Sequence, residues 1–238
     1  MFSQSPSYLP KLLETTSSKT AMKKIVLIGA GGHARVLIDT LSADKTAEVC
    51  GILDNNRDLW GIDIHGIPVI GGDDFLPKVG SQGATHFVIA IGGAKQAALR
   101  LKLYEIALQH GLTPASVQHP SAIISPRIKV GEGVQALAQC VINTGVTLQE
   151  NSIVNTSAII EHDCFIEAHA HIAPRACLAG GVRVGEGTHI GLGSIVKENI
   201  TIGKQVVVGA GAVVLNNVPA HSVVVGVPAK PIVHKEVA

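Results

Sequence analysis

The sequence predicts an α/β domain with a parallel sheet, followed by a column of stacked parallel β-strands. Strands alternate with helices between residues 23 and 110, which is typical of parallel sheets wound with helices. Beyond residue 118 the helical pattern ends, and an apolar residue recurs at every sixth position from Ile124 to Val214. The composition fits both parts, because 46% of the residues are hydrophobic and only 3% are aromatic, so Val, Ile, Leu and Ala must fill the core.

The first domain is expected to span residues 22–118. Its first helix should follow the turn Gly29-Ala30-Gly31-Gly32-His33-Ala34. Its second helix should run from about residue 95 to His110, and Gly111 should end it. Its strands are apolar runs that end at turn residues, at 23–28, 49–53, 67–70 and 86–91.

The second domain, residues 119–238, is expected to be a prism built from six-residue repeats. If three repeats form one turn, each coil takes 18 residues and the anchors span five coils. Glycines that directly follow several anchors, among them Gly131, Gly185 and Gly203, are expected at tight corners. The sixteen anchors are Ile124, Val130, Ala136, Ile142, Leu148, Val154, Ile160, Ile166, Ile172, Leu178, Val184, Ile190, Val196, Ile202, Val208 and Val214.

Charge, hydropathy and cysteine usage exclude several classes of protein. The 19 basic and 18 acidic residues form no long runs, which argues against a binder of nucleic acid or membrane surfaces. No apolar run is long enough for a membrane span, and the four cysteines lack C-x-x-C spacing, so a reduced cytoplasmic protein is expected. Residues 1–21, rich in Ser, Thr, Pro and Lys, are expected to be a disordered extension.

The glycine turn after the first strand is a candidate phosphate site, because free backbone amides and the helix dipole there can hold an anion. Ala34 in the turn and Asp54 after the second strand also fit the dinucleotide fingerprint, which makes a nicotinamide enzyme a rival interpretation. However, the domain supplies only one mononucleotide-binding half, so a single nucleotide-sugar fits better. A purely structural turn is the third interpretation.

Histidines of the repeat region are the candidates for acid–base or metal chemistry. His162 lies two residues beyond an anchor, beside Asp163, whose carboxylate can fix the imidazole tautomer and raise its basicity. By spacing alone, His162 is either a general base or a hydrogen-bonded surface residue. His171 and His189 are 18 residues apart and should stack on one outer face. With His162 and His169 they offer a zinc site, although solvated histidines are the simpler interpretation and no metal is expected.

Three segments of the second domain, at residues 155–164, 179–185 and 226–230, carry a family resemblance together with the glycine turn. The sequence resembles the sugar O/N-acetyltransferases of the sialic-acid and bacillosamine type over nearly everything from Met22 to Pro231. The nearest likeness is to acetyl-CoA-dependent enzymes that N-acetylate nucleotide-linked 4-amino-4,6-dideoxy sugars. The resemblance implies an α/β Rossmann-like half domain followed by a left-handed parallel β-helix.

The resemblance also implies roles for individual residues. His162 would be the general base, supported by Asp163, and acetyl-CoA would be the acetyl donor. His171 would contact acetyl-CoA, while the backbone amides of Leu192 and Ala210 would bond its pantetheine arm. The residues implied in the nucleotide-sugar pocket are Gly31, Gly32, His33, Asp54, Asn55, Gly92 and Asn155. Because relatives are trimers with sites between subunits, a homotrimer is the implied assembly.

The leading interpretation is an N-acetyltransferase in which the sugar amine attacks the thioester directly, with no metal and no acyl-enzyme. A UDP-linked, bacillosamine-type acceptor used in surface glycan or glycoprotein sugar synthesis is favoured. Two alternatives stay open: a sialic acid O-acetyltransferase, which would share every motif, and a non-catalytic nucleotide-binding scaffold, which would have no use for the His162–Asp163 pair.

Overall fold

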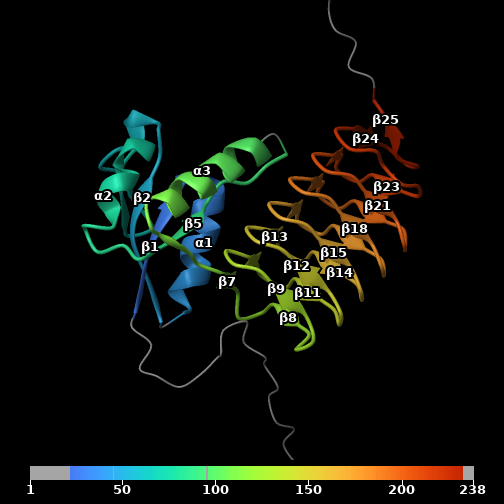
Figure 1. The fold of residues 1–238 in the computed structure, drawn as a ribbon, viewed down its shortest axis with the longest axis horizontal. Coiled ribbons are helices and arrows are strands. Elements are labelled where there is room, and N and C mark those ends of the chain that lie inside the picture. The colour runs from blue at the N-terminus through green and yellow to red at the C-terminus, as the bar shows by residue number, and fades with distance from the viewer. Residues whose placement is uncertain (1–21, 45, 95, 233–238) are drawn as a thin grey trace, which may run out of the picture.

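The computed structural model describes residues 22–44, 46–94 and 96–232, and shows an α/β domain set against a long column of β-strands (Figure 1). The extension expected at residues 1–21 lies outside the described residues. Within the described ranges, no helix combines the length and the apolar character needed to cross a membrane.

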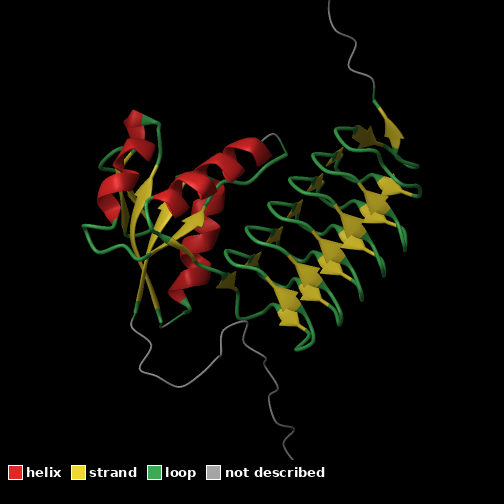
Figure 2. Ribbon diagram, viewed as in Figure 1, coloured by secondary structure: helices red, strands yellow, loops and turns green. Residues whose placement is uncertain are grey.

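The first domain is a six-stranded sheet flanked by helices (Figure 2). The strand order is β3-β4-β2-β1-β5-β6, in which only the β3–β4 pair is antiparallel. The elements are β1 (Lys23–Ile28), α1 (Gly32–Ser42), β2 (Ala47–Leu53), β3 (Asp63–Ile64), β4 (Ile67–Gly71), α2 (Leu76–Val79), β5 (His86–Ile89), α3 (Ala97–Gln109) and β6 (Thr113–Pro114). Short 3-10 turns lie at Arg57–Leu59 and Asp73–Phe75.

Side chains of the parallel strands alternate between two apolar clusters, as the pleat of a strand requires. Leu27 of β1 packs in one cluster with residues of α1, whereas Val26 packs in the other with residues of α2 and α3. Val117 and Leu137, which belong to the coils of the column, complete the α1 cluster. The α1 cluster therefore extends from the first domain onto the column.

The second domain is a column of coils whose two-residue strands form three parallel sheets, here called face I, face II and face III. Face I holds β7 (Val117–Gln118), β10 (Gln135–Ala136), β13 (Ile153–Val154), β16 (His171–Ile172), β19 (His189–Ile190), β22 (Val207–Val208), β24 (Val223–Val225) and the antiparallel β25 (Lys230–Pro231). Face II holds β8 (Ile123–Ile124), β11 (Val141–Ile142), β14 (Ile159–Ile160), β17 (Cys177–Leu178), β20 (Ile195–Val196) and β23 (Val213–Val214). Face III holds β9 (Lys129–Val130), β12 (Thr147–Leu148), β15 (Phe165–Ile166), β18 (Arg183–Val184) and β21 (Thr201–Ile202).

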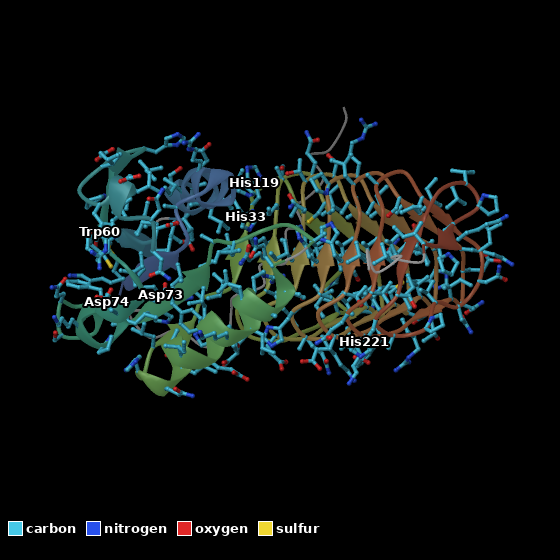
Figure 3. The ribbon with its side chains drawn as sticks, turned by 90° about the horizontal axis from the view of Figure 1, so that it is seen from above. His33, Trp60, Asp73, Asp74, His119 and His221 are labelled. Atoms are coloured by element: carbon cyan, nitrogen blue, oxygen red, sulfur yellow. The ribbon has the colours of Figure 1, made fainter. Side chains whose placement is uncertain are left out.

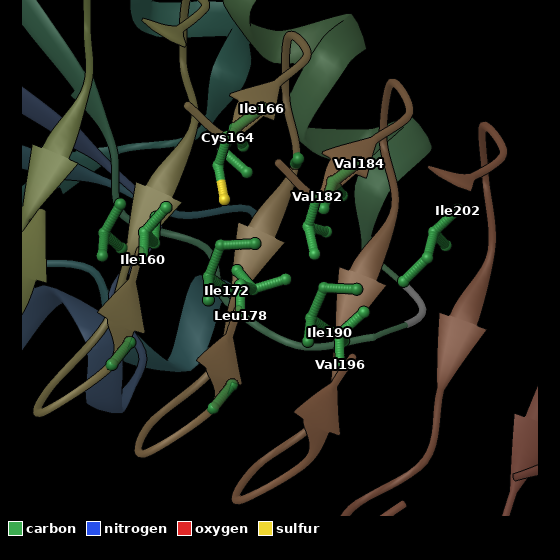
Figure 4. Close-up of a cluster of buried hydrophobic side chains, with 14 of the residues drawn as sticks. Ile160, Cys164, Ile166, Ile172, Leu178, Val182, Val184, Ile190, Val196 and Ile202 are labelled. Carbon is green, nitrogen blue, oxygen red and sulfur yellow. The ribbon is translucent and has the colours of Figure 1, made fainter. Parts of the chain in front are cut away.

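The expected register of 18 residues per coil is confirmed, since Gln135 pairs with Ile153 and Ile153 pairs with His171. The anchors point inward, and together with small residues two places earlier they fill the core of the column (Figure 4). All the anchors are buried except Val130, which is only partly covered. The coils thus bury one continuous apolar core along the whole column.

The corners of the coils correct one expectation. The left-handed backbone conformation falls three residues before each anchor from Ala136 to Val214, as at Gly133 (φ +69°) and Asp163 (φ +59°), rather than at the glycines that follow the anchors. Those glycines serve close approach instead, because a Cβ on Gly131 would lie 2.6 Å from the backbone nitrogen of Glu150 in the next coil. Glycine is therefore selected by inter-coil spacing at one position and by backbone conformation at the other.

The first domain covers face I over its first coils, where the outward residues from Val117 to His171 are buried, whereas Val207 and Val223 farther along are partly exposed. The guanidinium of Arg100, in α3, donates to the backbone carbonyls of Asn151 and His169 at one edge of the face. Face I also carries His171 and His189, and His171 is buried. The simple interpretation of solvated outward histidines is therefore wrong for His171, because the neighbouring domain excludes water from this face.

Candidate active site

The glycine turn lies at the carboxyl end of β1 and opens α1. Gly31 precedes the first turn of the helix, and no side chain caps it. A Cβ at Gly31 or Gly32 would meet no atom within 4 Å, so open space adjoins the turn. Exposed amides at a helix N-terminus attract negatively charged groups. The turn therefore has both the room and the polarity to hold a phosphate.

Asp54 reaches the glycine turn, but its neighbour Asn55 does not. The Asp54 carboxylate accepts hydrogen bonds from the backbone N–H groups of Ala30 and Asn56, each at 2.8 Å. Asn55 instead accepts from the backbone N–H of Asp73 at 2.9 Å. Figure 3 shows Asp73 and Trp60 on the side of the first domain away from the column. The structure thus assigns Asp54 to the support of the turn and directs Asn55 toward a separate loop.

His33, the second residue of α1, lies where the two domains meet (Figure 3). Its Nε2 lies 2.7 Å from Oε1 of Gln135, a fully buried residue of β10. Burial lowers the pKa of His33. Gly92 lies between His33 and His171, since a Cβ there would be 3.7 Å from Cγ of His33 and 3.8 Å from Cε1 of His171. The structure therefore brings three predicted site residues together.

His171 is held by Asn155 and His189. The side-chain oxygen of Asn155 accepts from the Thr156 backbone N–H at 2.8 Å, so the amide nitrogen of Asn155 donates to Nε2 of His171 at 3.0 Å. The rings of His171 and His189 meet edge to face, with centroids 4.8 Å apart. Burial and the nearby His189 and Arg100 hold the pKa of His171 well below its usual value. His171 is therefore neutral, with its proton on Nδ1, and that buried N–H has no partner among the described residues.

His162 and Asp163 form the second group of site residues. Nδ1 of His162 donates to Oδ2 of Asp163 at 2.9 Å, and both side chains are largely exposed. The left-handed conformation of Asp163 allows these sequence neighbours to face each other at the corner. Since Nδ1 carries the proton, the lone pair of the neutral ring is on Nε2. In the next coil, a Cβ on Gly180 would lie only 2.6 Å from this nitrogen, so Gly180 leaves the space that the ring occupies.

The two groups of site residues lie at different edges of the column. His162 lies at the edge where the chain passes from face II to face III, and in a three-sided column this edge is opposite face I. His171 lies on face I itself. Leu192 and Ala210, both exposed, follow face I strands at the edge toward face II, and they lie in successive coils. Face II therefore separates the His162–Asp163 pair from the other predicted site residues.

Face II itself presents an apolar outer surface. Ile123 is 66% exposed and Ile195 is 51% exposed. By contrast, face III presents mainly polar residues, with Arg183 stacked over the ring of Phe165. The outward residues of face II are Ile123, Val141, Ile159, Cys177, Ile195 and Val213. Such a continuous apolar surface is typical of an interface between proteins.

The histidines considered for zinc do not converge. His162 lies opposite face I, His169 lies at the edge between faces III and I, and His171 and His189 meet ring to ring. Across the part of the chain that the structure describes, no three His, Cys, Asp or Glu side chains are grouped for a metal ion.

Sequence reasoning missed Gln135, Gly180 and the apolar surface of face II. The 18-residue period could have revealed the last two, because it places Gly180 above His162 and aligns the outward residues of face II. Gln135 has no such signal, because its partners His33 and Ile89 come from the other domain.

Comparison with known proteins gives matches to both domains. The model of the PglD N-terminal domain family matches residues 24–106. The structure of PerB from Caulobacter crescentus with CoA and GDP-perosamine is 39% identical, with a TM-score of 0.82, covering 91% of this chain and 100% of PerB. The acetyltransferase domain of PglB from Neisseria gonorrhoeae, in complex with acetyl coenzyme A, is 34% identical, with a TM-score of 0.81, covering 88% of this chain and 99% of that one.

A curated relative, the GDP-perosamine N-acetyltransferase of Escherichia coli O157:H7, is 28% identical over 178 residues, which are 73% of this chain and 78% of that protein. The structural matches extend over both domains and confirm the predicted fold class, an α/β Rossmann-like half domain followed by a left-handed parallel β-helix.

Proposed function

Since the chain belongs to the family of acetyltransferases that use acetyl-CoA to N-acetylate nucleotide-linked amino sugars, we propose that its acceptor is a nucleotide-linked 4-amino-4,6-dideoxy sugar. The sequence favours a UDP-linked, bacillosamine-type sugar destined for a surface glycan or glycoprotein. The GDP-perosamine bound in PerB supports a GDP-linked acceptor as the second candidate. We also propose that the protein resides in the cytoplasm, because all four cysteines are free.

The observation that carries the proposal is the His162–Asp163 pair. An amine that attacks the thioester carbon must lose a proton as the new C–N bond forms, while the C–S bond breaks and CoA leaves as a thiolate that is protonated to the free thiol. Nε2 of His162 offers the lone pair for that proton, because Nδ1 donates its hydrogen to Asp163 at 2.9 Å. The negative charge of Asp163 then stabilises the imidazolium that results. His162 is thus proposed as the general base and Asp163 as the residue that orients it.

The residues near face I fit acetyl-CoA, which supplies an acetyl group as a thioester. The buried Nδ1–H of His171 has no partner among the described residues, and such a donor calls for an acceptor oxygen on a ligand. Asn155 keeps this hydrogen on Nδ1 by donating to Nε2. Leu192 and Ala210 follow the adjacent edge in successive coils, so their backbone amides are proposed to bind the extended pantetheine arm.

The glycine turn fits the acceptor. Gly31 and Gly32 leave open space at the positive end of α1, where a diphosphate would be stabilised. Asp54 braces the turn through Ala30. The other residues proposed in this pocket are His33, Asn55, Gly92 and Asn155, of which Asn55 would act from the loop that holds Asp73.

A homotrimer would complete the site. Within one chain, His162 lies across the column from the buried His171. The general base must, however, lie close to the sugar amine that it deprotonates at the acceptor pocket. The exposed apolar surface of face II lies between the edges that carry these groups. We therefore propose that face II packs against neighbouring copies and brings His162 of the partner subunit to the pocket at the domain junction.

The test is release of free thiol from acetyl-CoA with UDP-, GDP- and dTDP-linked 4-amino-dideoxy sugars and a sialic acid in parallel. Fast release with one amino sugar, lost in the His162→Ala variant, is expected. Release with sialic acid alone would replace the proposal by O-acetylation. No release with any acceptor, from folded trimeric protein, would favour the non-catalytic scaffold.

A further inference from the structure

Gln135 is a polar residue at a position where packing alone favours an apolar one. Its neighbours along face I, Val117 and Ile153, pair with it in register and are buried. Gln135 is itself 0% exposed, in a column whose core is apolar. Burying a primary amide is costly unless both its donor and its acceptor find partners. Here both partners come from the first domain.

The hydrogen bonds of Gln135 determine which way its amide points. Nε2 lies 2.9 Å from the backbone oxygen of Ile89, and a carbonyl oxygen can only accept. The amide nitrogen must therefore face Ile89, which leaves Oε1 at 2.7 Å from Nε2 of His33. Since Oε1 can only accept, the proton of His33 is on Nε2. In the neutral ring, the lone pair is consequently on Nδ1.

The free nitrogen of His33 is available to a ligand. Nδ1 has no hydrogen-bond partner among the described residues, and His33 is only part-buried. His33 directly follows Gly31 and Gly32 in the chain, where space is open, and its ring packs against Gly92. Burial and the helix N-terminus both disfavour the charged imidazolium, so the lone pair persists near neutral pH.

We propose that Gln135 is a positioning residue for the acceptor, acting through His33. It holds the ring in one tautomer and orientation, so that Nδ1 accepts a hydrogen bond from an N–H or O–H group of the amino-sugar nucleotide. The β-helix domain thereby takes part in acceptor recognition, through a residue that does not itself reach the open turn. This inference rests on the proposed function for the identity of the ligand.

A double-mutant cycle tests the proposal. Gln135→Leu is expected to lower kcat/KM for the nucleotide sugar about tenfold or more, while the KM for acetyl-CoA changes less than twofold. In a His33→Ala background, the same substitution should have almost no further effect on the nucleotide sugar, because the residue through which it acts is gone. Ile153→Val, at the next coil of face I, serves as the matched packing control. Effects that add independently, or an equal rise in both KM values, would overturn the positioning role.

A second measurement needs neither activity nor a variant. Two-bond ¹H–¹⁵N correlation spectra of the imidazoles distinguish the two neutral tautomers. The wild-type protein should show His33 neutral with its hydrogen on Nε2. A hydrogen on Nδ1 would refute the proposal, even if thiol release supports the proposed function. Conversely, the expected tautomer in a protein without thiol release would leave the Gln135–His33 contact standing and reject only the reaction.

Discussion

The two histidine groups of this protein occupy opposite sides of one column and differ in nearly every physical respect. At the domain junction, His171 is buried, neutral and oriented by neutral neighbours, namely Asn155 and the ring of His189. At the far edge, His162 is exposed and bonded to a carboxylate. The same residue type thus presents a hydrogen on Nδ1 at the buried site and a lone pair on Nε2 at the exposed site, according to burial and partner.

The largest effect is expected from separating the two groups. Ile159→Asp would place a charge at the middle of the apolar surface of face II, and burying that charge in an interface is strongly unfavourable. We expect the proposed trimer to dissociate and thiol release to fall below detection, measured by light scattering and by the thiol assay. Thr201→Asp on face III adds the same charge to an exposed position and should change neither property. A trimeric, active Ile159→Asp variant would contradict the shared site.

The next prediction concerns the exposed His162–Asp163 pair. Gly180→Ala would place a Cβ about where the ring of His162 lies, 2.6 Å from Nε2, so the ring must rotate away. The thiol-release rate should fall about 10- to 100-fold, within the range of general-base catalysis, with little change in melting temperature. Gly80→Ala is the control, because its Cβ would meet no atom within 4 Å. A wild-type rate in Gly180→Ala would show that the ring position does not matter.

A pH dependence of stability should come from the buried side. Burial lowers the pKa of His189 to about 4, below its value of about 6.5 in the unfolded chain. Between these values the unfolded state binds more protons, so stability is lost as the pH falls from 6.5 toward 4. The loss should reach about 2 kcal/mol per chain near pH 5. Denaturant titrations at several pH values give the free energy of unfolding as a function of pH. This free energy should change less with pH in His189→Gln than in the wild type. An equal pH dependence in both proteins would contradict the lowered pKa of His189.

The smallest effect concerns the orientation of His171. Asn155→Ala removes the donor that keeps the hydrogen of His171 on Nδ1, a loss of about 1 kcal/mol. The KM for acetyl-CoA should rise roughly three- to tenfold. Ser157→Ala, at an exposed hydrogen bond nearby, is the matched control. A change confined to the KM of the amino sugar would instead assign Asn155 to the acceptor pocket alone.

The sequence predicts the column well because each anchor obeys a local rule. Ile160, Ile172 and their counterparts recur every six residues, and this period requires no knowledge of distant contacts. The His162–Asp163 contact is equally local, since the two residues are adjacent in the chain. The strands of the first domain are also marked by apolar runs that end at turns.

The parts that escaped prediction depend on how distant segments meet. The burial of His171 follows from docking of the first domain on face I, which no periodic pattern encodes. Gln135 carries no motif, because its meaning comes from Ile89 and His33. The corner glycines were misplaced because close backbone approach and left-handed conformation both favour glycine, and only the coordinates separate the two causes.

The extension of the α1 cluster onto the column has a practical consequence for protein engineering. Leu137 packs with α1 although it belongs to the coils, so a cut between residues 118 and 119 would divide this cluster. A chimera that exchanges the first domain must therefore carry the first coil and the start of the second with it. Gln135 lies in the first strand of that second coil, so a crossover placed after Leu137 transfers the histidine of the turn and its support as one unit.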